Sequence, residues 1–104
     1  MEPRSMELQL ELEDLLGTEN VYFQPGPSVR MKYPCFVFNR TTAFQPKADD
    51  KTYLFRPGYE VTYINRDEPD PEILERVSRR FYNCRYNRHY VADNLHHDTF
   101  TIYY

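Results

Sequence analysis

Eight prolines divide the chain into short segments and so limit the length of any helix or strand that it can form. Proline lacks a backbone N–H, and it cannot continue a helix or the middle of a sheet. Between the prolines, ten tyrosines and seven phenylalanines favour strands, because aromatic side chains suit a pleated and partly buried surface. We therefore expect one small domain of short elements that is rich in β-structure.

The segment 5–16 has the apolar spacing of a helix. Four leucines recur along it at helical intervals: Leu8, Leu12, Leu15 and Leu16. Ser5 is the expected N-cap, and Gly17 is the expected C-terminal stop. The opposite face of this helix is acidic, and a short strand through residues 8–12 is the weaker alternative.

The segment 71–81 is the second expected helix. Asp70 is placed to cap it, and Pro71 stands at the first helical position, where a missing N–H costs little. Its apolar stripe consists of Ile73, Leu74, Val77 and Phe81. Acidic residues come early and arginines late in this segment, which is the order that complements the helix dipole.

The remaining segments indicate strands joined by loops. Expected strands cover residues 20–24, 34–40, 51–65, 84–92 and 98–104. The polar residues 41–51 predict a loop, and residues 92–98 predict a turn. The order α-β-β-β-α-β-β predicts a single α+β domain over residues 1–104, a two-layer sandwich in which two helices cover one face of a mainly antiparallel sheet.

Charge and hydropathy exclude several classes of protein. The net charge of −3 is not the basic excess that marks an obligate nucleic-acid binder. An apolar run near 18 residues and a basic-then-apolar leader are both missing from the sequence, so we expect a protein that is neither membrane-bound nor secreted. Cys35 and Cys84 lie far apart, and in a reducing compartment both thiols are expected to be free, with a single disulfide as the alternative.

Histidines and aspartates gather near the C-terminus and raise the question of a metal site. The residues are Asp93, His96, His97 and Asp98, with His89 across the presumed hairpin. Their spacing matches no closed metal site, and adjacent residues of a strand point to opposite faces. A polar turn explains the cluster, so we predict no metal and no cofactor, although a metal-dependent hydrolase would use these residues.

Arginines alternate with tyrosines over residues 76–90. This pattern could neutralise phosphates and stack bases, so a small nucleic-acid-binding module is one alternative. The acidic residues that precede the segment argue against it. A surface that is acidic at one pole and basic at another fits head-to-tail association between copies of the chain.

The sequence predicts no enzyme. Cys35 sits in an apolar strand, where thiols are usually inert, and no Cys-His pattern accompanies Cys84. Three glycines are too few for a phosphate-binding loop.

Four stretches together resemble the tail terminator or tail completion proteins of long-tailed bacteriophages with non-contractile tails. They are LLGTENVYFQP, MKYPCFVF, TYINRDEPDPEILERV and RHYVADNLHHDTFTIYY. The resemblance runs over nearly the whole chain and includes no catalytic signature. Another neck or connector protein is the closest alternative.

The resemblance implies a structural virion protein, assembled in the host cytoplasm, that forms a ring of about six copies on the head-proximal end of the tail tube. Such a ring ends tube growth and enables head-tail joining. Its implied partners are the tail tube protein and the head connector or closure protein. DNA passes through the lumen of the ring without being read.

We assign candidate contacts from these considerations. Subunit contacts are assigned to the acidic face of the first helix and to later arginines: Glu7, Glu11, Asp14, Arg79, Arg80, Arg85 and Arg88. Docking on the tube or connector is assigned to the expected loop: Phe44, Gln45, Lys47, Asp49 and Asp50.

Overall fold

The computed structural model describes residues 3–44, 57–66 and 71–104. In these ranges the chain forms two helices and five strands. In chain order they are α1 (Pro3–Leu16), β1 (Val21–Phe23), β2 (Cys35–Phe44), β3 (Pro57–Asn65), α2 (Pro71–Arg80), β4 (Cys84–Ala92) and β5 (Leu95–Tyr103). The order α-β-β-β-α-β-β and the α+β class are as predicted.

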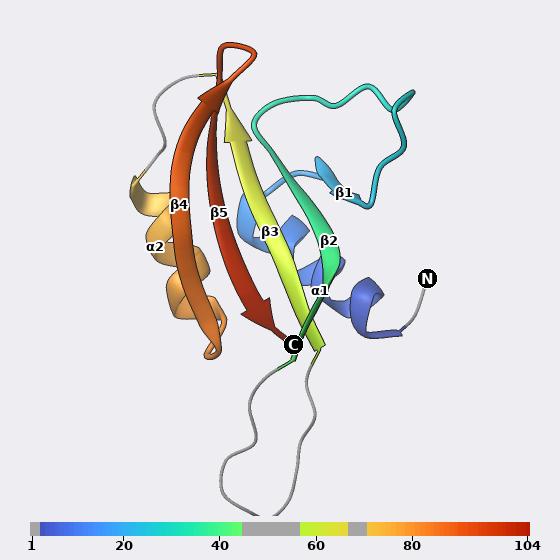
Figure 1. Ribbon diagram of the computed structural model, residues 1–104, viewed down its shortest axis with the longest axis vertical. Helices are drawn as coiled ribbons and strands as arrows, with labels where there is room; N and C mark the ends of the chain where they lie inside the picture. The colour runs from blue at the N-terminus through green and yellow to red at the C-terminus, as the bar shows by residue number, and fades with distance from the viewer. Residues whose placement is uncertain (1–2, 45–56, 67–70) are drawn as a thin grey trace, which may run out of the picture.

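The strands form one mixed sheet in the order β1-β2-β3-β5-β4. The short β1 runs parallel to β2, and the other neighbours are antiparallel. β2 is an interior strand, as its apolar sequence predicts, while β1 and β4 are the edges. Both helices lie on the same side of the sheet, with α2 beside β4 and α1 behind β2 and β3 (Figure 1).

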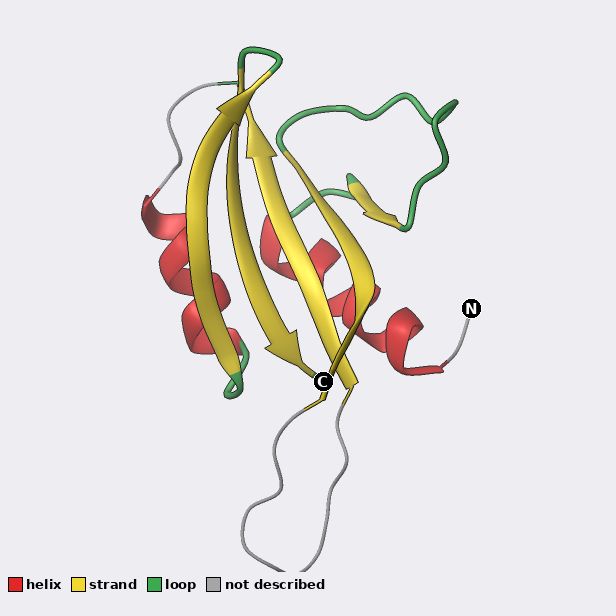
Figure 2. Ribbon diagram, viewed as in Figure 1, coloured by secondary structure: helices red, strands yellow, loops and turns green. Residues whose placement is uncertain are grey.

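The core lies between the helices and this face of the sheet, and the helices and strands separate cleanly into two layers (Figure 2). Alternate residues of the strands point into it, as the two-residue period of a strand requires. Among the described residues, the apolar side chains with at most 1% exposure are Leu8, Leu12, Cys35, Phe36, Phe38, Tyr59, Val61, Val77, Phe100 and Ile102. Both predicted helical stripes therefore face the core.

The N-terminus of α1 differs from the prediction. The helix begins at Pro3, because proline is well suited to the first turn of a helix. Ser5 is therefore not the N-cap but lies inside the first turn. Its side chain is fully buried, and its hydroxyl oxygen is 3.3 Å from the hydroxyl oxygen of Tyr59. The other end is as predicted: Gly17 has a φ of 85° and donates its N–H to the carbonyl of Glu13.

The predicted turn over residues 92–98 is wrong. β5 begins at Leu95, which pairs with Ala92, and only Asp93 and Asn94 form the turn. Their φ values are 54° and 62°. Aspartate and asparagine tolerate this left-handed region, so two residues suffice to reverse the chain in a tight hairpin. His96, His97 and Asp98 consequently belong to a strand.

The expected loop over residues 41–51 begins later than predicted, because its first four residues belong to β2. β2 continues as far as Phe44, after an irregular register that follows Arg40. The rest of that loop, and residues 51–56 of the strand expected over 51–65, lie outside the described residues. β3 is described from Pro57 onward.

Candidate functional site

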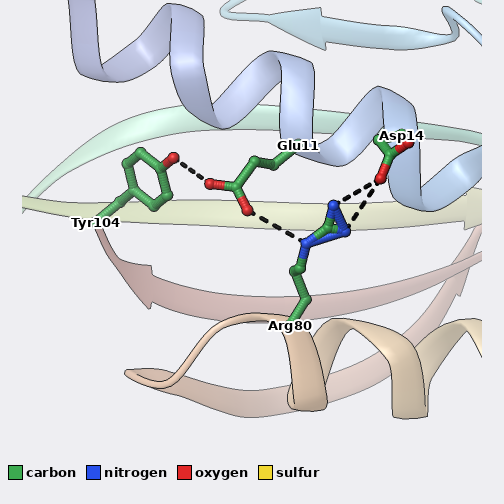
Figure 3. A network of polar contacts seen from close by, with 4 residues as sticks. All are labelled: Glu11, Asp14, Arg80 and Tyr104. Carbon is green, nitrogen blue, oxygen red and sulfur yellow. Dashed lines mark hydrogen bonds and ion pairs between the residues drawn. The ribbon is translucent and has the colours of Figure 1, made fainter.

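Arg80, the last residue of α2, joins the two helices. Its Nη2 lies 2.7 Å and its Nη1 3.3 Å from Oδ2 of Asp14, while its Nε lies 3.3 Å from Oε1 of Glu11. Figure 3 shows the guanidinium held between the two carboxylates of α1. The planar guanidinium presents its donors in a fixed fork, so these contacts fix the position of one helix against the other.

The C-terminal residue takes part in the same network. The hydroxyl of Tyr104 donates a hydrogen bond to Oε2 of Glu11 (Figure 3). Burial, and then this hydrogen bond, raise the pKa of Tyr104 well above its ordinary value. The ring of Tyr104 also packs edge-on against Phe81, with 6.1 Å between the ring centroids. Glu11 therefore links α1 to both α2 and the end of the chain.

These contacts change the interpretation of three predicted interface residues. Glu11, Asp14 and Arg80 were assigned to contacts between subunits, but the structure brings them together within one chain. Their charges are already compensated there. A charge reversal at Arg80 would place three carboxylates side by side, so it would perturb the folded monomer as well as any assembly.

The remaining predicted interface residues are exposed. Glu7 lies on α1, and Arg79 lies on α2, where it forms an ion pair with Glu75 at 3.3 Å. Arg85 and Arg88 lie on β4 and face away from the helices, because they pair with residues of β5 on the uncovered face of the sheet. These four side chains are exposed in the monomer, and their assignment to contacts between subunits stays a prediction.

Arg88 belongs to a stacked row on the uncovered face of the sheet. Its Cζ lies 4.7 Å from the centroid of the Tyr90 ring. The Tyr90 ring in turn stacks on the His97 ring, with 4.6 Å between centroids and 9° between planes. A cation held over an aromatic ring is pre-oriented, so this arginine presents its charge in a defined place.

The outer face of α1 carries an exposed apolar pair that the sequence analysis did not assign to a site. Met6 is 52% exposed and Leu10 is 59% exposed. Beside Leu10 lies a shallow hollow of about 380 Å³, whose other lining residues are Glu13, Asp14, Gly17, Thr18 and Glu19. The surface is thus apolar at its centre and acidic at its rim.

A third group of side chains lies where β4 and β5 approach their turn, on the face that the helices cover. Asp98 is 1% exposed. Its Oδ1 accepts a hydrogen bond from the Tyr86 hydroxyl at 2.7 Å and lies 3.0 Å from Nδ1 of His89. Nε2 of His89 lies 3.3 Å from Nδ1 of His96. His97 points to the other face of β5, as the alternation of a strand requires.

Both cysteines are free. Burial raises the pKa of Cys35 to about 12 and that of Cys84 to about 11. A thiol with so high a pKa is almost entirely protonated at neutral pH and is a poor nucleophile. The two thiols therefore have the properties of packing groups.

Most of the docking residues assigned to the loop lie outside the part of the chain that the structure describes. Phe44 is the last residue of β2, whereas Gln45, Lys47, Asp49 and Asp50 lie outside the described residues. The assignment of docking to this segment stays a prediction.

Comparison of the chain with protein-family models, with curated proteins and with solved structures found no match. Neither of the helices described here is long and apolar enough to cross a membrane.

The strand position of His96 and Asp98 and the two-residue turn before them were missed from the sequence, although both had a usable signal. The alternation of His96, Asp98 and Phe100 with their neighbours already had the two-residue period of a strand. The Asp93-Asn94 pair was a signal for a two-residue hairpin turn. The partnership of Tyr104 with Glu11 had no local signal, because the two residues are 93 positions apart.

Proposed function

We propose that the chain is a structural virion subunit that forms a closed ring at the head-proximal end of a phage tail. The ring ends growth of the tail tube and prepares the tail for joining to the head. The sequence resemblance suggests this role, and the arrangement of charge and apolar surface in the single chain supports it.

The observation that carries the proposal is the placement of two unlike surfaces on opposite sides of the molecule. One is the outer face of α1, here called the α1 surface and formed by Met6, Glu7, Leu10 and Glu13. The other is the outer face of β4, here called the β4 surface and formed by Arg85 and Arg88. Figure 1 shows α2 beside β4 at one edge of the sheet and α1 behind β2 and β3, toward the edge formed by β1.

Two different complementary surfaces on opposite sides are what a head-to-tail ring requires. In the proposed contact the acidic rim of the α1 surface meets the arginines of the next subunit, and Met6 and Leu10 are removed from water. Met6 and Leu10 are 52% and 59% exposed, so burying the exposed part of each contributes about 1 kcal/mol, roughly half of the value for a fully exposed side chain, while the charges mainly fix orientation. Charged residues on an edge strand oppose pairing with another strand. The contact is therefore made by side chains and does not extend the sheet.

The partners of the ring follow from the same proposal. The segment 41–51, with Phe44, Gln45, Lys47, Asp49 and Asp50, docks on the tail tube protein or on the head connector or closure protein. DNA passes through the lumen without sequence recognition. Deleting residues 46–50 is expected to leave the ring intact and to yield heads and tails that do not join. Infectious particles from that deletion would remove the docking assignment.

Assembly is tested on the full chain by analytical ultracentrifugation across a range of protein concentration. The wild-type chain is expected to form a closed species of about six copies. The double variants Met6→Ser/Leu10→Ser and Arg85→Glu/Arg88→Glu are each expected to remain monomeric and folded. Arg30→Glu is the matched control, because it reverses an exposed charge outside both surfaces. Equal association of all four proteins would refute the assigned contact.

Binding of single-stranded nucleic acid through residues 76–90 is the second candidate, and the stacked Arg88 and Tyr90 favour it. It is tested by fluorescence anisotropy of a labelled oligonucleotide at several salt concentrations. This candidate expects binding that weakens steeply with salt and is lost in Arg88→Glu. The proposed ring subunit has no such affinity as a monomer.

A further inference from the structure

Two imidazoles and a buried carboxylate lie side by side in a row that crosses from β5 to β4 and back to β5. Asp98 stands opposite His89 in the pairing of the two strands, and His96 is the next residue of β5 on the same face. The contacts run from Oδ1 of Asp98 to Nδ1 of His89 at 3.0 Å, and from Nε2 of His89 to Nδ1 of His96 at 3.3 Å. The proposed ring contact uses none of these three residues.

The buried carboxylate decides which nitrogen of His89 carries hydrogen. An ionised carboxylate is only an acceptor, so the hydrogen of His89 stands on Nδ1 and is donated to Asp98. Nε2 of His89 is then left with a lone pair that faces His96. A carboxylate that holds the far nitrogen of an imidazole in this way is the usual second layer of a histidine metal site, because it fixes the ring and increases its basicity.

We propose that Nε2 of His89 and Nδ1 of His96 together bind one zinc ion. Two nitrogens that are each about 2.0–2.1 Å from a tetrahedral zinc lie roughly 3.3 Å from each other. The two nitrogens in this structure are 3.3 Å apart. The ring centroids are 5.3 Å apart and these two nitrogens are 3.3 Å apart, so the rings meet edge to edge through the nitrogens, and both lone pairs are directed into the space between the rings.

Zinc takes the place of the hydrogen that the two rings share. His96 carries its own hydrogen on Nε2 when Nδ1 is bound, so both rings ligate in the neutral form. Imidazole nitrogen selects zinc and related transition ions over calcium or magnesium, which prefer oxygen. Among the described residues no group of three or more potential ligands converges on one point. Within the described residues the proposed ion therefore has two protein ligands, and water fills the open positions.

The burial of the Asp98 carboxylate, together with its unpaired oxygen, is an independent reason to expect a cation beside His89. Its side chain is 1% exposed, and within the described part of the chain its Oδ2 has no hydrogen-bond partner. Burying a carboxylate with half of its acceptors unused is costly unless positive charge lies nearby. An ion on the opposite nitrogen of His89 supplies that charge, while Tyr86 fixes the orientation of the carboxylate.

The experiment is a calorimetric titration of zinc into the full chain, with four single variants. The wild-type chain is expected to bind one ion per chain with a saturable isotherm. His89→Ala and His96→Ala are expected to abolish that isotherm. His97→Ala is the matched control, because its ring lies on the other face of β5, and Cys84→Ser excludes a thiolate ligand. Both controls are expected to bind as the wild-type chain does.

Asp98 is tested as a positioning residue by Asp98→Asn. The expected result is a roughly 10–100-fold weaker zinc affinity, together with a changed tautomer of His89 in the ¹⁵N spectrum of its ring. Thermal unfolding followed by circular dichroism establishes that each variant is folded. If His89→Ala fails to fold, the partly exposed His96→Ala alone decides, with ¹⁵N shifts of His89 as the direct readout.

Three results would each overturn the proposal. They are a wild-type chain without saturable binding, undiminished binding in His96→Ala, and equal loss of binding in the His97→Ala control. A zinc-induced shift of the His89 Nε2 resonance without a change at His97 is the result that the geometry predicts.

Discussion

Replacing Arg80 with alanine is expected to weaken the attachment of α2 to α1. The substitution removes the ion pairs with Glu11 and Asp14, whose shortest N–O distances are 3.3 Å and 2.7 Å. It also leaves two carboxylates near each other without the cation between them. Because the network is formed inside one chain, the loss should appear in a monomer and should not depend on protein concentration.

The magnitude follows from the exposure of the pairs. The Arg80 side chain is 34% exposed, and its partners Glu11 and Asp14 are 35% and 75% exposed, so solvent screens both pairs. Partly exposed pairs contribute about 0.2–1 kcal/mol each, which gives a total near 1 kcal/mol for Arg80→Ala. In a chain of this length that loss lowers the Tm by roughly 4–8 °C. High salt should shrink the difference.

The assay is urea unfolding followed by circular dichroism, with Arg79→Ala as the matched control. Arg79 is the neighbouring arginine, and its pair with Glu75 lies within one helix and is highly exposed, so its loss should cost no more than about 0.5 kcal/mol. A double-mutant cycle of Arg80→Ala with Asp14→Ala isolates the coupling between the two helices. Zero coupling, with Arg80→Ala as stable as Arg79→Ala, would refute the internal bridge and return Arg80 to the interface between subunits.

Two further predictions concern the core and the pH dependence of stability. Leu12→Ala should cost about 2–5 kcal/mol because its side chain is fully buried, whereas Leu10→Ala should stay within about 0.5 kcal/mol because Leu10 faces solvent; similar losses in urea unfolding would contradict the assigned orientation of α1. Burial and a hydrogen bond raise the pKa of Tyr86 from 10.0 to about 12, so the folded chain retains a proton that the unfolded chain loses. Stability should therefore fall as the pH rises from about 10 to about 12, less steeply in Tyr86→Phe, and identical slopes in urea unfolding at pH 9 to 11.5 would contradict this.

Much of the fold was predictable because local pattern and tertiary structure agree. The leucine stripe of α1 favoured a helix over a short strand, and the proline at the start of α2 and the apolar run of β2 each had one physically consistent interpretation. Gly17 ended α1 where the sequence indicated, since its φ of 85° is readily adopted only by glycine. Such positions combine local propensity with burial, so the sequence alone identifies them.

The errors came from positions where local pattern was ambiguous. Ser5 is a good N-cap residue, but α1 begins two residues earlier, at Pro3. Ser5 therefore lies inside the first turn, and its side chain points into the core. The polar residues after Ala92 suggested a long turn, because strands with histidine and aspartate are less common than turns with them. A buried Asp98 is tolerated in β5 because Tyr86 and His89 bond to it, and that pairing is visible only in three dimensions.

The candidate site shows the same limit more strongly. Charge patterns correctly indicated an acidic α1 and a basic β4, but they could not tell a contact within the chain from a contact between chains. Glu11, Asp14 and Arg80 met inside one molecule, while Arg85 and Arg88 stayed exposed. Distances between elements that are 66 or more residues apart decide this, and no local pattern carries them.

The most direct test of the account is native mass spectrometry of two assembly-deficient variants, alone and mixed. Met6→Ser/Leu10→Ser retains only the β4 surface, and Arg85→Glu/Arg88→Glu retains only the α1 surface. Each alone should be monomeric, and the mixture should form a one-to-one pair that cannot grow, while the wild-type chain closes into a ring of about six. A mixture that stays monomeric, or a single variant that still forms rings, would contradict the claim that two unlike surfaces of this chain assemble head to tail.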